Sequence, residues 1–187
     1  MSRLNVGDVV PAQVFETING VEVPLPDPAG RLIHVQFRRF AGCPICNLHL
    51  RQFAHRVGEL EAAGVVEVAF FHSEAETMRK YQADLPFAVV ADPQKGRYRA
   101  FGAEAGWRSV LNPGAWGGYL KGVFGKHPSS SIDGEGGHLG LPADFLIDAA
   151  GRVVALKYGT HANDQWTVGD LLGVVADFRK SGGAVAA

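Results

Sequence analysis

Two cysteines spaced as Cys-x-x-Cys constrain this 187-residue chain more than any other feature. Cys43 and Cys46 are its only cysteines, and residues 32–40 before them mix apolar and β-branched types, as a buried strand does. Apolar residues then recur at helical intervals from Cys46 to Leu60, and Pro44 suits the first position of a helix. The pair is therefore predicted to lie on a strand-to-helix turn.

The two cysteines are expected to have different surroundings. Cys43 falls at the helix start, where free backbone N–H groups and the helix macrodipole favour a thiolate, and Arg38 and Arg39 are close in sequence. Cys46 falls one turn later on the apolar side of the same helix. Residues three apart in a first turn are about 5–6 Å apart, within reach of a disulfide. Cys43 is thus predicted to be the attacking sulfur and Cys46 the resolving sulfur.

Three roles besides redox chemistry are open to such a pair. Free cysteines are often inert core residues. A zinc site needs four ligands, and no second cysteine pair or closely spaced histidine pair supplies the rest. Haem attachment would need a histidine after Cys46, where Asn47 stands. A Cys-x-x-Cys beside a strand–helix unit is the signature of thiol redox chemistry, which we favour, with no metal and no cofactor expected.

Charge and composition limit which classes of binding partner are expected. The formal net charge is −1, and the 18 lysines and arginines are dispersed, so neither nucleic acid nor a membrane is expected as a partner. Residues 1–8 lack the apolar run of a signal peptide, and no stretch approaches the length of a membrane span. We therefore expect a cytoplasmic protein. In that reducing compartment a purely structural disulfide is disfavoured.

Local patterns predict an α/β chain. An N-terminal β-hairpin is expected around Asn19-Gly20, with Gly64 as a helix C-cap, Asp92 as an N-cap, and Thr167 with Asp170 as a capping box. The expected strands are 14–18, 21–23, 32–40, 65–71, 87–91, 144–148 and 153–157, and the expected helices are 74–82, 93–101, 168–180 and the one that begins at the cysteines.

One domain spanning 1–187 is expected, because the chain is 47% hydrophobic and long enough for one core. Within it we predict an N-terminal hairpin extension (1–30), a glycine-rich insertion (102–141) and a frayed tail (181–187). The insertion carries aromatic residues, Trp107, Trp116, Tyr119 and Phe124. Burying them would offset the entropy of ordering the loop, which favours a packed flap or the contact of a homodimer.

This order of elements, a hairpin, then β-α-β, then β-β-α with Cys-x-x-Cys after the first central strand, resembles the thioredoxin fold of redoxins. The peroxiredoxin-like AhpC/TSA family is the nearest resemblance, based on segments 37–46, 145–153 and 158–164 and spanning about 5–180. The resemblance implies a central mixed sheet flanked by helices. It also implies a thiol-disulfide oxidoreductase or antioxidant protein. Its substrate would be a protein or small-molecule thiol, disulfide or peroxide, and an external thiol would reduce it again.

The resemblance to peroxiredoxins assigns the cysteines differently. Cys46 takes the peroxidatic position, Arg39 stands where the family pattern has proline, and Cys43 stands where it has threonine or serine. Pro142 replaces the family's arginine that polarises the peroxide. A thiol peroxidase with Cys46 as the peroxidatic residue is therefore an alternative.

The resemblance to thioredoxins implies a substrate groove. Leu141-Pro142 falls where that family has a cis-proline facing the cysteine pair, which predicts a cis bond and a substrate-binding set of Leu141, Pro142 and Arg39. Gln36 stands where thioredoxin has a buried aspartate that aids proton transfer, so no proton acceptor for the second thiol is assigned.

The seven histidines form no pair with the spacing of metal ligands and are assigned no role, including His161, which lies near Asp164 in a polar loop. A non-catalytic module that binds a partner through the thioredoxin fold, with incidental thiols, is the alternative from a different functional class.

Overall fold

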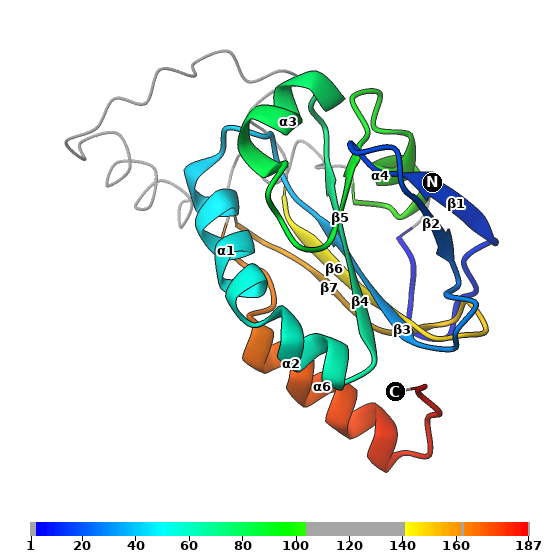
Figure 1. The fold of residues 1–187 in the computed structure, drawn as a ribbon. Helices are drawn as coiled ribbons and strands as arrows, with labels where there is room; N and C mark the ends of the chain where they lie inside the picture. The colour runs from blue at the N-terminus through cyan, green and yellow to red at the C-terminus, as the bar shows by residue number, and fades with distance from the viewer. Residues whose placement is uncertain (1–2, 104–140, 162, 187) are drawn as a thin grey trace.

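A five-stranded mixed sheet with helices around it forms the body of the chain (Figure 1). The computed structural model describes residues 3–103, 141–161 and 163–186. The strands are β1 (Gln13–Glu16), β2 (Glu22–Leu25), β3 (Leu32–Phe37), β4 (Val65–Phe71), β5 (Ala88–Ala91), β6 (Ala143–Ile147) and β7 (Val153–Tyr158). The helices are α1 (Pro44–His55), α2 (Val57–Ala62), α3 (Ala75–Gln82), α4 (Gly96–Ala100) and α6 (Val168–Lys180). None of the helices in these ranges is long and apolar enough to cross a membrane.

The sheet has the order β5-β4-β3-β6-β7, with β3 at its centre. β3 and β4 are parallel, as are β4 and β5, whereas β6 runs antiparallel to both β3 and β7. Phe37, at the end of β3, lies opposite Phe70 on one side and Ala143 on the other. The chain that leads to the cysteines therefore leaves the sheet where β4 ends and β6 begins. The predicted thioredoxin-like fold is confirmed.

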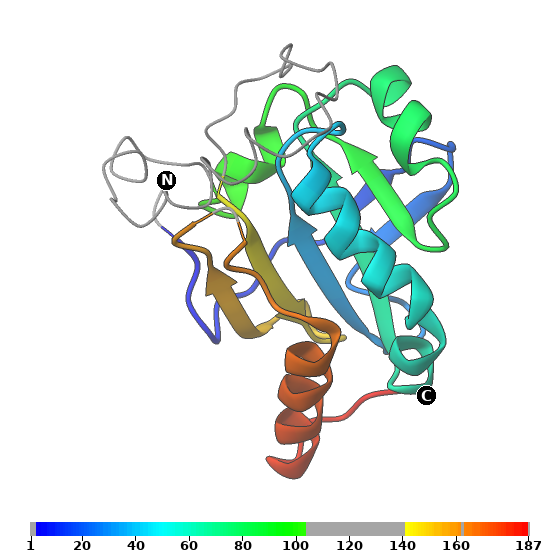
Figure 2. The same ribbon diagram turned by 90° about the vertical axis from the view of Figure 1, so that its left-hand side faces the viewer.

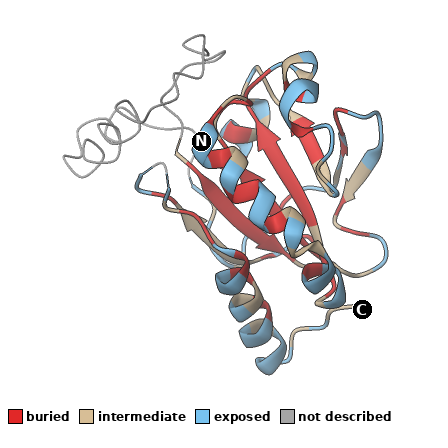
Figure 3. Ribbon diagram, turned by 60° about the vertical axis from the view of Figure 1, so that its left-hand side comes forward, coloured by how far each residue is buried: buried red, intermediate tan, exposed pale blue. Residues whose placement is uncertain are grey.

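Different elements pack on the two faces of the sheet. α1, α2 and α6 lie on one face, and the β1–β2 hairpin and α4 lie on the other, as two views at right angles show (Figures 1 and 2). The central strands are buried, while α1 alternates between buried and exposed residues along its length (Figure 3). Its buried residues are Cys46, His49, Leu50 and Phe53. The second cysteine is thus on the side of α1 that faces the sheet.

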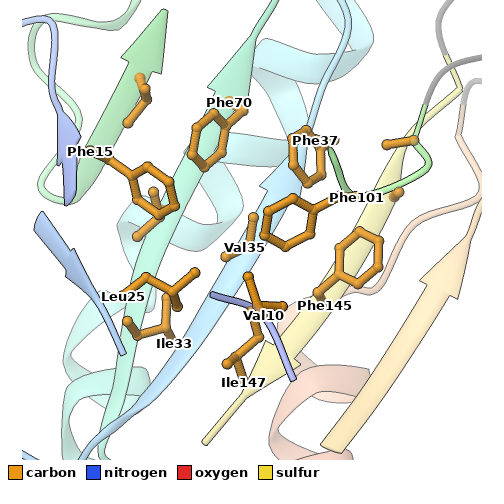
Figure 4. Close-up of a cluster of buried hydrophobic side chains, with 14 of the residues drawn as sticks. Val10, Phe15, Leu25, Ile33, Val35, Phe37, Phe70, Phe101, Phe145 and Ile147 are labelled. Carbon is orange, nitrogen blue, oxygen red and sulfur yellow. The ribbon is translucent and has the colours of Figure 1, made fainter. Parts of the chain in front are cut away.

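Aromatic rings dominate the core on the hairpin face (Figure 4). The Phe37 ring lies 5.1 Å from that of Phe70 and 5.8 Å from that of Phe145, and Phe15 from the hairpin packs edge-on against Phe70 at 4.9 Å. Such arrangements add about 0.5–1.5 kcal/mol per pair beyond area burial. On the other face, one apolar cluster surrounds the cysteines and a second joins α1, α2 and α6 to the sheet.

Most predicted elements are present, and several of their ends differ from the predicted ones. The hairpin around Asn19-Gly20 forms, but its strands pair only as far as Glu16 opposite Glu22, and Gly20 has the positive φ of 77° that the turn requires. The expected helix from the cysteines to Leu60 is in fact two helices, because the backbone leaves the helical region at Arg56 (φ −115°, ψ 18°).

Two other expectations were wrong. The Leu25–Pro26 peptide bond is the only cis bond among the described residues, so the cis bond predicted at Leu141–Pro142 is absent. The tail after α6, predicted to be frayed, packs on the domain, since the Ala186 N–H donates to the Gly30 carbonyl oxygen at 3.1 Å. The aromatic residues of the 102–141 insertion lie outside the described residues.

The capping box of α6 supplies a stability test. The Thr167 hydroxyl oxygen accepts the Asp170 N–H at 3.1 Å, and the Asp170 carboxylate accepts the Thr167 N–H at 2.9 Å. Thr167→Ala should lower the free energy of unfolding by about 1 kcal/mol, measured by urea denaturation. Thr167→Ser keeps the oxygen and should lose less than half of that. Equal losses in the two variants would contradict a capping role.

Candidate active site

The two cysteines meet at the first turn of α1. Cys43 is the N-cap residue, Pro44 is the first helical residue, and Cys46 points inward one turn later. The Cys46 thiol donates to the Cys43 sulfur across 2.9 Å, and each cysteine is only 2% exposed. Both thiols are free. Since a disulfide is about 2.05 Å long, the sulfurs need to approach by only about 1 Å to bond.

The loop that carries Cys43 is held from several sides. The Ala41 N–H donates to the Ser73 hydroxyl oxygen at 3.0 Å. The Ala41 carbonyl oxygen accepts the side-chain amides of Asn47 at 3.1 Å and Gln82 at 2.7 Å. Ser73 follows β4, and Gln82 ends α3. Side chains from α1, from α3 and from the segment after β4 therefore hold the loop that carries Cys43.

The hydrogen bond from Cys46 is the main reason that the pKa of Cys43 falls to about 6. Burial opposes this effect, while the backbone N–H groups of Cys46 and Ile45 and the charge of Arg39 also lower the pKa of Cys43. These groups are what a helix N-terminus offers an anion. Cys43 is therefore a thiolate at neutral pH.

The same hydrogen bond acts on Cys46 in the opposite direction. Together with burial and the negative charge of Cys43, it raises the pKa of the Cys46 thiol well above its usual value. The backbone N–H of Arg39 and the charge of Arg38 favour the Cys46 thiolate but are outweighed. The pair thus consists of one thiolate and one thiol that donates to it.

A buried arginine lies beside this helix face. Arg38 is 1% exposed and directly follows β3. Its Nη2 donates to the Asp144 carboxylate at 2.7 Å, to the Gln36 side-chain oxygen at 2.6 Å and to Nε2 of His49 at 3.1 Å. Burial, followed by the charge of Arg38, lowers the pKa of His49 to about 3, which makes His49 a neutral acceptor.

The network continues along β3 to a second ion pair. His34 donates from Nδ1 to the Glu67 carboxylate at 2.9 Å, and the Gln36 amide donates to the same carboxylate at 2.5 Å. His34 Nε2 lies 3.3 Å from the Asp144 carboxylate. Burial lowers the pKa of His34, but the two carboxylates outweigh it and raise that pKa to about 9. His34 and Arg38 therefore balance the charges of Glu67 and Asp144.

This network was not predicted from the sequence. The histidines were considered only as metal ligands, and none has the spacing of one. The signal was present in the alternation of β3, in which His34, Gln36 and Arg38 alternate with the apolar Ile33, Val35 and Phe37 in a strand predicted to be buried. Polar residues at a period of two in such a strand need partners on that face, and β4, β6 and α1 supply them.

The predicted substrate residues Leu141, Pro142 and Arg39 lie near the end of β3 that leads to the cysteines. Leu141 and Pro142 precede Ala143, which pairs with the last residue of β3. The Pro142 carbonyl oxygen accepts the Gly159 N–H at 2.8 Å, and a Cβ on Gly159 would come within 2.8 Å of the Pro142 ring. Arg39 lies close enough for its charge to lower the pKa of Cys43. His161 is exposed and is assigned no role.

A cavity of about 430 Å³ opens elsewhere, between the hairpin, α2 and the start of β5. Val23, Glu61 and Phe87 are among its lining residues. Neither cysteine lines it, so it does not belong to the thiol site.

The family comparison agrees with this geometry. The profile of the AhpC/TSA family matches residues 6–156. The chain belongs to the AhpC/TSA family. It is 27% identical over 164 residues to the Mycobacterium tuberculosis H37Rv protein Rv2521, which bears the name of a peroxiredoxin, and the match covers 86% of this chain and 89% of that protein. The chain is accordingly a thiol-dependent oxidoreductase, and the non-catalytic module considered above is set aside.

Solved structures show the same fold at low identity. Peroxidoxin BcpB of Mycobacterium tuberculosis superposes with a TM-score of 0.65 at 14% identity, covering 95% of this chain and 98% of that one. PrxQ of Xylella fastidiosa superposes with a TM-score of 0.67 at 13% identity, and the match covers 97% of this chain and 99% of that one. A Chlorobium tepidum protein named as the thiol:disulfide interchange protein DsbE superposes with a TM-score of 0.60 at 20% identity. That match covers 92% of this chain and 99% of the other.

The hydrogen bond between the sulfurs predicts how Cys43 titrates. Cys46→Ala removes the donor and should raise the pKa of Cys43 by about one to two units, because a hydrogen bond to a charged group contributes about 1.5–3 kcal/mol. Cys46→Ser keeps a donor and should raise that pKa less. The pH dependence of the alkylation rate gives the pKa of each variant. Equal values in Cys46→Ala and the wild type would contradict the role of this bond.

The raised pKa of His34, about 9, predicts a pH-dependent contribution to stability. In the unfolded chain histidine titrates near 6.5, so the contribution is complete below about pH 6.5 and is lost as the pH rises through 9. The stability lost in His34→Gln should therefore shrink by on the order of 3 kcal/mol between pH 6 and pH 9.5 in urea unfolding. Comparing the variant with the wild type at each pH cancels the titration of other groups.

His49 supplies the matched control, because its pKa is shifted in the other direction. Its neutral form is favoured by folding, so its contribution is present above about pH 6.5 and is lost as the pH falls towards 3. His49→Gln should leave the alkaline slope unchanged. A constant difference between His34→Gln and the wild type over the whole range would show that folding does not raise the pKa of His34.

Proposed function

We propose that Cys43 and Cys46 are the redox centre and that Cys43 attacks the substrate. With a disulfide R–S–S–R′, the Cys43 thiolate bonds to one sulfur and R′–S⁻ leaves with the electron pair. The Cys46 sulfur then attacks Cys43, loses its proton, and expels R–S⁻, which takes up a proton as R–SH. The protein ends with a Cys43–Cys46 disulfide, and the substrate is reduced to two thiols.

A peroxide can take the place of the disulfide in the same scheme. The Cys43 thiolate attacks the O–O bond of ROOH, forms a sulfenic acid, and releases the other oxygen as ROH after protonation. The Cys46 thiol then condenses with the sulfenic acid, which forms the disulfide and releases water. In both cases an external thiol, the reductant, must reduce the disulfide before the next cycle.

The arrangement of the two sulfurs carries this proposal. The thiolate lies at the N-cap of α1 and the thiol lies 2.9 Å away, so the two sulfurs need to approach by only about 1 Å for resolution. An attacking thiolate with a pKa near the ambient pH combines a large thiolate fraction with good nucleophilicity. The pKa of Cys43, about 6, is close to this optimum.

Substrate contacts are proposed for the surface around Cys43. Arg39 would hold an anionic substrate or leaving group through its charge, and Leu141 with Pro142 would border the substrate where β6 begins. Ile45 and Leu48, which are 42% and 64% exposed, add apolar surface on the outer side of α1. Such a surface fits a protein or small-molecule partner that presents a disulfide with apolar neighbours.

Three expectations from the sequence stay predictions. A homodimer would use the aromatic residues of the insertion, and size-exclusion chromatography of the whole chain tests it. The absence of membrane and nucleic-acid partners, and a cytoplasmic location, are expected from charge, composition and apolar patterning of the sequence alone.

The alternative assignment makes Cys46 the peroxidatic residue. It is favoured by the Arg39 N–H and the Arg38 charge, both of which lower the pKa of Cys46. In the wild type the Cys43 thiolate outweighs them. In a chain with serine at position 43 they would act on Cys46 without that opposing charge.

Single-cysteine variants distinguish the two assignments. Cys46→Ser should form a stable mixed disulfide or a sulfenic acid on Cys43, because it cannot resolve. Cys43→Ser should react with disulfides or hydrogen peroxide at least about tenfold more slowly than the wild type at pH 7, because burial still raises the pKa of its remaining thiol, Cys46. Stopped-flow rates and mass spectrometry of the modified peptide provide the measurements. Rapid peroxide consumption by Cys43→Ser, with none by Cys46→Ser, would establish the alternative.

A further inference from the structure

We propose that buried Arg38 is a positioning residue for the second half of the reaction: it holds a fixed positive charge beside Cys46, against which the Cys46 thiolate forms when it resolves the adduct on Cys43. This inference rests on the proposed function, in which Cys43 attacks first. Arg38 follows the last residue of β3 and lies against the inward side of α1.

The hydrogen bonds of Arg38 place its charge under the first two turns of α1. Its Nη2 is 3.1 Å from Nε2 of His49, and His49 follows Cys46 by three residues, so both lie on the buried side of the helix. The next residue, Arg39, directs its backbone N–H at the Cys46 sulfur. Two neighbouring residues of the β3–α1 connection therefore favour negative charge on that sulfur.

The guanidinium is held in place on every side. Asp144 and Gln36 accept two of its strongest hydrogen bonds, and its Nη1 also donates to the Phe37 carbonyl oxygen at 3.2 Å. The Tyr98 hydroxyl lies 2.5 Å from the Arg38 carbonyl oxygen. A charge fixed in this way needs no reorganisation when the thiolate forms, which is how preorganised groups stabilise developing charge.

The negative charge of Asp144 does not cancel the effect of Arg38 on Cys46, because Asp144 also interacts with other donors. Asp144 lies near His34 Nε2 at 3.3 Å and accepts the Trp166 N–H at 3.2 Å, in addition to its bond with Arg38. On the α1 side Arg38 contacts neutral His49. The positive charge is thus balanced on the sheet side and unbalanced towards the cysteines.

Bonding of Cys43 to the substrate changes which groups determine the pKa of Cys46. In the resting pair the Cys46 proton is held by the hydrogen bond to the Cys43 thiolate and by its negative charge. Once Cys43 is part of a mixed disulfide, both effects end, and burial alone opposes the Arg38 charge and the Arg39 N–H. The Cys46 thiol therefore becomes more acidic at the stage that requires it.

The resolving step is balanced without a further reagent. The Cys46 S–H bond breaks, and its electron pair forms the bond to the Cys43 sulfur. The bond between Cys43 and the substrate sulfur breaks, and the substrate leaves as a thiolate with that electron pair. The proton from Cys46 ends on this leaving group or in water.

A reporter disulfide tests the proposal with both steps visible. 5,5′-Dithiobis(2-nitrobenzoate) releases one coloured nitrothiobenzoate when Cys43 attacks and a second when Cys46 resolves the adduct. In Arg38→Met the first release should stay within about twofold of the wild type. The second should slow by about tenfold, as one unit of thiol pKa implies. Arg38→Lys should recover part of the second rate.

The neighbouring arginine is the matched control. Arg39→Met should slow the first release, because the charge of Arg39 acts on Cys43. The pH profile of the second release is a readout that a purely structural role would not move. Its midpoint should shift upward in Arg38→Met and stay unchanged in Arg39→Met.

The test stays decisive if Arg38→Met fails to fold. The double variant Arg38→Met/Asp144→Leu removes both charges together, which is often tolerated where removing one partner is not. It should show the same slow second release, with a native circular dichroism spectrum. An unchanged second rate and pH midpoint in the folded variants would overturn the proposal. A first adduct found on Cys46 by mass spectrometry would instead overturn the proposed function.

Discussion

The two-sided character of β3 is the constraint on which the rest of the structure depends. One side of the strand supplies aromatic and aliphatic residues to the core beneath the hairpin. The other side supplies His34 and Gln36, and Arg38 continues the alternation directly after the strand. Because the side chains of a strand alternate, a shift of register by one residue would place two cations in the aromatic core. The ion pairs with Glu67 and Asp144 therefore fix β4 and β6 in register with β3 and bring the cysteine loop to its place.

Such a network is costly as a source of stability alone. Each buried ion loses hydration worth several kcal/mol, and well-packed apolar residues often stabilise a core as much or more. The charges of the network are nevertheless paired: protonated His34 and Arg38 face two carboxylates, and Gln36 bridges the two pairs through both ends of its amide. Pairing limits the cost, and placing the network against α1 lets the charge of Arg38 act on the chemistry.

The sequence was sufficient for the fold and for the positions of the cysteines, because these depend on local patterns. Periodicity and capping residues predicted β4 and α6 to the residue. The network was not predicted, because it joins residues more than 100 positions apart in the chain, such as Arg38 and Asp144. The peptide bond before Pro142 was mispredicted, because the prediction came from family resemblance and not from local sequence.

The spacing of the cysteines links these observations to the order of the reaction. Because the second cysteine follows the first by three positions at one helix start, the sulfurs share a single proton. Only one sulfur can be a thiolate at a time, since each negative charge disfavours the other. In the proposed reaction the attack by Cys43 removes its charge, and the groups around Cys46 then favour the second thiolate. Under this proposal the geometry of one turn of helix sets which sulfur reacts first and when the other follows.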